Sequence, residues 1–139
     1  MNITCIMDYE HQTGKSGMLV TLDDNTKFKQ LNVDNAKSYN HGVILSMVST
    51  LEALEKEGVR NCNITLKHQL EFILYMFSTK TSKSFPTEAS KIFNLIEQLK
   101  TRGNSIKYSK ITTKENQVKK MFKTIPTTVK RSQLSEIQL

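Results

Sequence analysis

Three short apolar runs, each followed by a polar stretch, open this chain and limit the folds it can adopt. The runs span residues 3–7, 18–22 and 28–33, and each has the length and composition of a strand. The polar stretches between them, residues 8–16 and 23–26, contain Asp, Asn, Gly and Ser, which are typical of turns. We therefore predict three consecutive strands in an antiparallel meander.

A helix and a fourth strand are predicted next. Asn40 is the expected N-cap of this helix, and Gly58 is expected to stop it as a C′ glycine. Apolar residues recur between them at helical spacing, which gives one apolar stripe: Ile44, Met47, Val48, Leu51 and Leu54. Beyond this helix, Ile64 and Leu66 alternate with polar residues, as in a short strand.

The second half of the chain predicts more helices and one more strand. A helix over residues 69–78 is apolar nearly all round, which indicates burial, and Pro86 fits the start of the next helix, which ends at Gly103. Ile106 and Tyr108 alternate with polar neighbours and indicate a final strand. A last, basic helix has an apolar edge formed by Val118, Met121, Phe122 and Ile125.

This order of elements predicts an α/β fold, a five-stranded mixed sheet with flanking helices. At 139 residues the chain fits one domain, which we place at residues 1–125, followed by a basic, flexible tail at 126–139. Because crossover connections are right-handed, we expect the Cys5 strand at the centre of the sheet. It should run parallel to the Cys62 strand and antiparallel to the strand at 18–22.

Composition excludes several classes of protein. No apolar run approaches the ~20 residues that span a bilayer, and Asp8, Glu10 and His11 interrupt any signal-peptide core. We therefore expect a cytoplasmic protein. In that compartment Cys5 and Cys62 are expected to be buried free thiols rather than a disulfide. The chain has no CxxC motif or His/Cys cluster, so no structural zinc site is expected.

The order of elements resembles the ribonuclease H-like superfamily. That superfamily has three antiparallel strands, a helix, a parallel strand, further helices, a last strand and a C-terminal helix. In ribonucleases H the first strand ends in an Asp followed by a loop of small residues, matched here by Asp8 with Gly14 and Gly17 beyond it. The resemblance covers nearly the whole chain and implies a ribonuclease H-like fold.

The positions that hold catalytic carboxylates in that family differ in this chain. The family's first long helix begins with Asn, two residues and a catalytic Glu, but residues 40–43 read Asn-His-Gly-Val here, so Val43 takes the Glu position. The family's fourth strand ends in Asp-Ser, where residues 67–69 read Lys-His-Gln. Glu115 is the candidate for the acidic residue that opens the family's last helix.

These differences bear on the chemistry that the resemblance implies. The family uses two magnesium ions about 4 Å apart to stabilise the attacking and leaving oxygens of a phosphate. Hard cations need several carboxylate oxygens, and Val or Lys supplies none. Asp8 alone cannot hold two metals. We therefore expect a degenerate site with no catalytic residue, no metal and no other cofactor, in which Asp8 is a relic metal ligand.

Alternatives remain for the polar residues of this site. Asp8 either retains a relic metal position or caps a strand-to-loop turn. His41 and His68 are either a general-base pair or ordinary polar surface. A rearranged acidic site would use Asp8, Glu10, Glu71 and Glu115.

The positive charge of the chain is unevenly spread. The net charge is +7, which favours nucleic-acid or acidic partners. Phosphate contact needs such charge and no particular sequence. The candidate phosphate contacts are Lys114, Lys119, Lys120, Lys123, Lys130, Arg131, Lys27 and Lys29. The alternative is a solvated helix face with a basic end. Aromatic residues are too scattered for a stacking platform, which disfavours a single-strand binder.

Three functions follow from these observations. The leading hypothesis is a non-catalytic ribonuclease H-like module that binds nucleic acid or a nucleic-acid-handling protein, and no membrane. Its high Lys, Asn and Ile content suits a virus or mobile element with an AT-rich genome. The second is an active metal-dependent nuclease or junction resolvase of the same superfamily, and the third is a protein-binding inhibitor or adaptor.

An enzyme needs at least three carboxylates near Asp8, a nucleic-acid binder needs a contiguous basic face, and an adaptor needs an exposed apolar patch.

Overall fold

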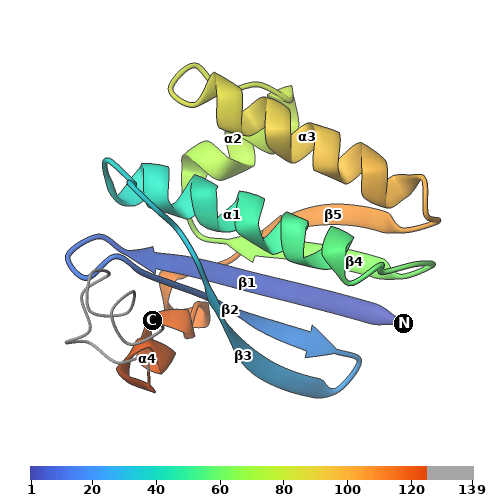
Figure 1. The fold of residues 1–139 in the computed structure, drawn as a ribbon, viewed down its shortest axis with the longest axis horizontal. Helices are drawn as coiled ribbons and strands as arrows, with labels where there is room; N and C mark the ends of the chain where they lie inside the picture. Colours follow the sequence, from blue (N-terminus) through green and yellow to red (C-terminus); the bar gives the residue numbers. More distant parts are fainter. Residues whose placement is uncertain (125–139) are drawn as a thin grey trace, which may run out of the picture.

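A five-stranded mixed sheet organises the molecule in the computed structural model, which describes residues 1–124 (Figure 1). The strands are β1 (Asn2–Glu10), β2 (Lys15–Leu22), β3 (Asn25–Leu31), β4 (Asn63–His68) and β5 (Ser105–Lys110). Their order across the sheet is β3-β2-β1-β4-β5. β1 pairs antiparallel with β2 and parallel with β4, and β4 pairs parallel with β5. The predicted sheet, with the Cys5 strand at its centre, is confirmed.

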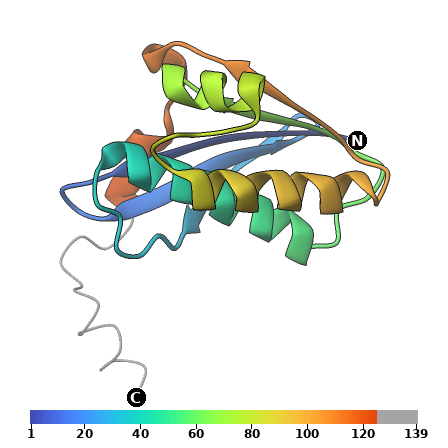
Figure 2. The same ribbon diagram turned by 90° about the horizontal axis from the view of Figure 1, so that it is seen from above.

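The helices are distributed over both faces of the sheet. α1 (Tyr39–Lys56) and α3 (Pro86–Lys100) pack side by side on one face, as Figure 2 shows, and α2 (Glu71–Thr79) lies against β5. The short helix α4 (Val118–Met121) contacts β1 and β2. The single turns η1 (Thr113–Glu115) and η2 (Phe122–Thr124) precede and follow α4.

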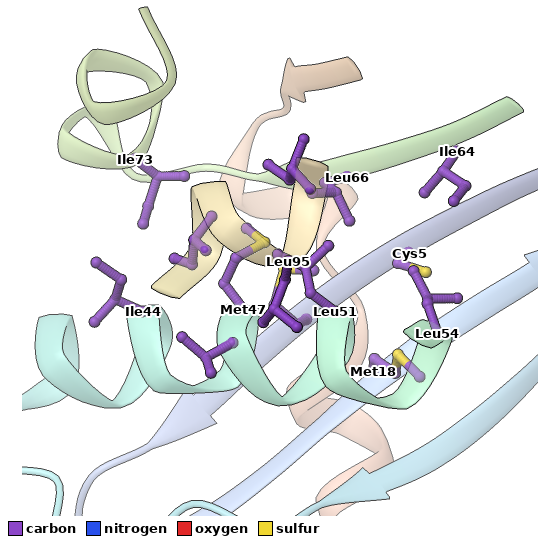
Figure 3. Close-up of a cluster of buried hydrophobic side chains, with 14 of the residues drawn as sticks. Cys5, Met18, Ile44, Met47, Leu51, Leu54, Ile64, Leu66, Ile73 and Leu95 are labelled. Atoms are coloured by element: carbon purple, nitrogen blue, oxygen red, sulfur yellow. The ribbon is translucent and has the colours of Figure 1, made fainter. Parts of the chain in front are cut away.

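Each face of the sheet has its own apolar cluster, because alternate residues of a strand point to opposite sides. Cys5 and Met7 belong to the main core, between the sheet and α1. Ile6 points the other way and packs with Val118 and Phe122 of the α4 segment. Figure 3 shows side chains of the sheet and helices meeting in the main core, among them Cys5, Met18, Met47, Leu51, Leu66 and Ile73.

The ends of α1 are set by local backbone chemistry. Its N-cap is Ser38 rather than the predicted Asn40, because Ser38 is extended and its Oγ accepts the N–H of His41 at 3.1 Å. At the other end Gly58 follows the helix with a φ of +69°, a conformation that glycine adopts without strain. The predicted glycine stop is therefore confirmed, and the predicted start is two residues late.

The start of α2 also differs from the prediction. The helix begins at Glu71, whereas the sequence pattern placed its start at residue 69. Leu70 keeps an extended backbone, and its N–H donates to the ring of His68 instead of entering the helix. The start of α3 at Pro86 is confirmed.

Both cysteines are buried and free, as predicted, although Cys62 precedes β4 instead of lying in it. Within residues 1–124 the helices are too short or too polar to cross a membrane. The predicted tail, with Lys130 and Arg131, and Ile125 of the predicted last helix lie outside the described residues.

Candidate functional site around Asp8

Asp8 lies inside β1, where its backbone pairs with Gly17 of β2. The strand continues to Glu10, so Asp8 does not cap a strand-to-loop turn, and that alternative is wrong. Asp8 alternates in the same phase as Ile6, which places its side chain on the α4 side of the sheet. The residue is only 2% exposed, and a carboxylate buried to this extent requires hydrogen-bond donors.

Three donors meet at Oδ1 of Asp8. The backbone N–H of Tyr9 and the hydroxyl of Tyr39 each donate over 2.8 Å, and Nε2 of His68 lies 3.4 Å away. Burial on its own would raise the pKa of the Asp8 carboxyl. The hydrogen bonds from these three groups outweigh burial and hold that pKa below its ordinary value. Asp8 is therefore an ionised carboxylate whose charge is stabilised by protein donors.

His68, the last residue of β4, contacts Asp8 through its imidazole ring. Its side chain is fully buried, and its Nδ1 accepts the N–H of Leu70 at 3.1 Å. An acceptor role for Nδ1 puts the ring proton on Nε2, the nitrogen that faces Asp8. The imidazole thus donates to the carboxylate, at the strand end where the resemblance would place a second carboxylate.

Tyr39 extends the network toward α4. Its hydroxyl accepts a 3.3 Å hydrogen bond from Nε2 of Gln69, and Oε1 of Gln69 accepts one of 2.8 Å from Nδ2 of Asn116. Nζ of Lys119 lies 4.5 Å from the centre of the Tyr39 ring, a cation–π contact. Burial, and then the negative charge of Asp8, raises the pKa of Tyr39, so its hydroxyl stays protonated and continues to donate.

Tyr39, Gln69 and Asn116 belong to this site although the sequence pattern did not predict them there. The bond from Tyr39 to Asp8 joins residues 31 apart, and the bond from Asn116 to Gln69 joins residues 47 apart, so no local pattern marks them. Their places in the chain were the only sign of this role in the sequence. Tyr39 and Gln69 adjoin the helix start and the strand end where the resemblance expects metal ligands.

The other acidic candidates do not join Asp8. Glu10 and Glu115 each hydrogen-bond to a nearby threonine, and Glu71 pairs with Lys110. Val43, at the expected Glu position, is fully buried in the main core. Residues 1–124 contain no group of three or more His, Cys, Asp or Glu that could hold a metal. The residues present therefore do not fit a pair of magnesium ions, and the rearranged acidic site is not assembled.

His41 and His68 take part in separate contacts. The ring of His41 stacks on Phe85 with centroids 5.3 Å apart, and its Nε2 lies 3.1 Å from Oε2 of Glu88. Its Nδ1 accepts the N–H of Lys37 at 3.0 Å. Both ring nitrogens of His41 are engaged, and its contacts with Phe85 and Glu88 join α1 to the start of α3. The two histidines therefore form no general-base pair.

No protein-family model and no curated protein matches the chain, but solved structures do. RNase H1 from the halophilic archaeon Halobacterium salinarum NRC-1 has a TM-score of 0.62 at 14% identity, covering 84% of this chain and 90% of that one. LC11-RNase H1, solved in complex with an RNA/DNA hybrid, has a TM-score of 0.61 at 16% identity and covers 82% and 88%. The chain has a ribonuclease H-like fold.

A third ribonuclease H-like neighbour agrees. The N-terminal RNase H domain of a Mycobacterium tuberculosis protein, solved as a fusion with maltose-binding protein, has a TM-score of 0.61 at 12% identity and covers 85% and 92%. The resemblance inferred from the order of elements is confirmed. At these identities the likeness establishes the ribonuclease H-like fold and no activity.

Within this ribonuclease H-like fold, the predicted phosphate contacts divide between the two faces of the sheet. Lys27 and Lys29 of β3 pair with Val20 and Met18 of β2, whose side chains belong to the main-core side. Both lysines therefore point away from the α4 side. Four exposed lysines lie in or beside α4: Lys114, Lys119, Lys120 and Lys123. The described candidates do not share one face of the sheet.

Proposed function

We propose that this chain is a non-catalytic ribonuclease H-like module that binds nucleic acid without cutting it. The observation that carries the proposal is the state of Asp8, whose Oδ1 accepts from Tyr9 and Tyr39 and faces the Nε2–H of His68. Two-metal hydrolysis requires several carboxylate oxygens directed at the cations. In this site three donors of the protein meet at one oxygen of a single carboxylate and stabilise its negative charge.

Charge supports the binding half of the proposal. The net charge is +7, and exposed lysines in and beside α4 lie on the same side of the sheet as Asp8. Lysines placed in this way attract phosphates without regard to base sequence. Among the neighbours in fold, LC11-RNase H1 was solved with an RNA/DNA hybrid, which makes a hybrid duplex the first ligand to test.

A protein partner is the second candidate, and one observation favours it. A cavity of about 440 Å³ between α2, α3 and β5 is lined in part by Phe77, Phe93 and Tyr108. The large hydrophobic side chains that are exposed within residues 1–124 are Met1, Leu22 and Tyr75, and none of them lines this cavity, although Tyr75 belongs to α2. Exposed large hydrophobic side chains are few in this described part, whereas exposed lysines are many, so nucleic acid is the preferred ligand.

The test combines binding and cleavage in the same samples. Fluorescently labelled RNA–DNA hybrid, duplex DNA and duplex RNA are titrated with the full chain at several salt concentrations, first in EDTA and then with magnesium or manganese. Salt-dependent binding with intact strands supports the proposal. Undetectable binding at low salt would overturn the nucleic-acid proposal in favour of a protein partner. Cleavage would overturn it in favour of an active nuclease.

A further inference from the structure

The part of the sheet that α4 leaves uncovered presents polar side chains. Across β1, β4 and β5, Thr4 pairs with Thr65, and Thr65 pairs with Lys107. Further along the strands, Ile6 pairs with Lys67. Because paired residues of adjacent strands share a face, and Ile6 packs beneath α4, these side chains lie on the α4 side of the sheet.

This surface forms a shallow cavity of about 600 Å³, which we call the polar sheet face. Its lining consists of amides, hydroxyls and lysines, with two isoleucines: Asn2, Thr4, Asn63, Ile64, Thr65, Lys67, Ser105, Ile106, Lys107 and Ser109. Asp and Glu are absent from this lining, which combines two positive charges with six hydroxyl or amide side chains. A surface that offers donors and positive charge without carboxylates complements an anion.

Some polar side chains of this face are held in place by hydrogen bonds to one another. Nδ2 of Asn63 donates to Oδ1 of Asn2 at 3.2 Å, and the hydroxyl of Ser105 donates to Oδ1 of Asn63 at 2.7 Å. Lys67 and Lys107 form no salt bridge with a carboxylate of residues 1–124, although Glu115 lies near enough to Lys67 to offset part of its charge. Both ammonium groups remain available to a ligand.

We propose that the polar sheet face binds the sugar–phosphate backbone of duplex nucleic acid, with Lys67 and Lys107 as its charged contacts. Protein contacts to phosphate and sugar come mainly from Lys, Arg, Ser, Thr and Asn side chains, and these types, Arg excepted, make up the polar lining. Aromatic side chains are absent from the lining, so the face lacks the stacking platforms that hold unpaired bases. The inference rests on the proposed function and assigns it a surface and a ligand class.

The position of this face relative to α4 supports the assignment. Ile6 lies between them, because it pairs with Lys67 on β4 and packs against Val118 of α4. A duplex lying on the polar sheet face therefore meets the α4 lysines on the same side of the sheet. Lys27 and Lys29 point to the opposite side and cannot contribute to the same contact.

The test compares two double variants that lose the same charge from opposite faces. Lys67→Ala/Lys107→Ala and the control Lys27→Ala/Lys29→Ala are titrated with a labelled RNA–DNA hybrid, duplex DNA and a single strand between about 50 and 200 mM salt. We expect the first variant to bind duplexes about tenfold more weakly at the lower salt and to lose roughly two units of salt slope. The control should retain most of its affinity, and unfolding temperatures establish that both variants fold.

Each other outcome is informative about a different claim. Wild-type protein that binds no nucleic acid overturns the proposed function and this inference together. Wild-type binding that the two double variants weaken equally overturns this inference and leaves the proposed function standing. A larger decrease for the single strand than for the duplexes overturns the duplex assignment. Thr65→Glu, which puts a negative charge at the centre of the face, should also weaken duplex binding, and unchanged binding would contradict the proposal.

Discussion

The hydroxyl of Tyr39, at the start of α1, donates a 2.8 Å hydrogen bond to Oδ1 of Asp8 in the central strand β1. The same hydroxyl accepts from Gln69, so it connects the carboxylate to the segment that follows β4. The Asp8 carboxylate, in the central strand of this ribonuclease H-like fold, is thus held through Oδ1 by donors of the protein itself. Substitutions at these positions test the structural role of the network.

Tyr39→Phe should destabilise the protein by about 1–3 kcal/mol, because it removes one donor from the buried Asp8 and leaves the Gln69 amide without its acceptor. Chemical denaturation measures the change in the free energy of unfolding. Tyr75→Phe is the matched control, since Tyr75 is 60% exposed, and it should change stability by less than about 0.5 kcal/mol. Equal effects of the two substitutions would contradict the role given to the Tyr39 hydroxyl.

Asp8 should make stability depend on pH in the acid range. Its pKa is lowered in the folded protein, so its contribution is fully present above the unfolded pKa of about 3.9 and is lost as the pH falls through the folded value. The stability advantage of wild type over Asp8→Asn should therefore be largest near neutral pH and shrink below about pH 4. Urea denaturation of both proteins across this range measures it, and an advantage that grows on acidification would oppose the assignment.

The sheet could be predicted from the sequence, because strand alternation, the apolar stripe of α1 and the handedness of crossovers are properties of short segments or of topology. Glycine at position 58 marked the end of α1 for the same local reason. The start of α2 could not be predicted, since it depends on the ring of His68 accepting the N–H of Leu70. That contact exists only once β4 has placed His68 in the core.

The candidate site was less predictable than the fold. The sequence pattern identified Asp8 and the absence of carboxylates at Val43 and residues 67–69. It did not reveal that His68 and Tyr39 supply donors instead, because their side chains reach Asp8 across 60 and 31 residues of chain. Lys119 was assigned to phosphate contact, but its ammonium also lies over the Tyr39 ring, an interaction that helical periodicity does not reveal.

His68→Asp should place a second carboxylate beside Asp8 and so test whether a missing carboxylate is what prevents metal binding. Two like charges placed in the same buried site disfavour the folded state, so the unfolding temperature should fall in EDTA and recover in part with manganese, which can bind between them. His68→Asn is the uncharged control, and its unfolding temperature should not respond to manganese. A manganese response in wild type as large as that of His68→Asp would show that the native site already holds a metal.

The α4 lysines should contribute to nucleic-acid affinity independently of base sequence. Lys119→Ala/Lys120→Ala/Lys123→Ala should weaken binding to all duplexes by similar factors and lower the salt slope by roughly one unit for each lysine that touches a phosphate. Because Lys119 also lies over the Tyr39 ring, the double variant Lys120→Ala/Lys123→Ala separates the effect of charge from that of the cation–π interaction. Binding that neither variant changes would locate the nucleic-acid surface elsewhere.

Cleavage assayed under conditions of measured binding tests the central claim most directly. The 139-residue chain, in excess over labelled RNA–DNA hybrid and branched DNA, is incubated with magnesium or manganese while anisotropy reports the bound fraction. We predict that the nucleic acid is bound and that its strands stay intact, because Asp8 is the one carboxylate at the site within residues 1–124. Robust cleavage that disappears in Asp8→Asn would contradict the account and identify Asp8 as a working metal ligand.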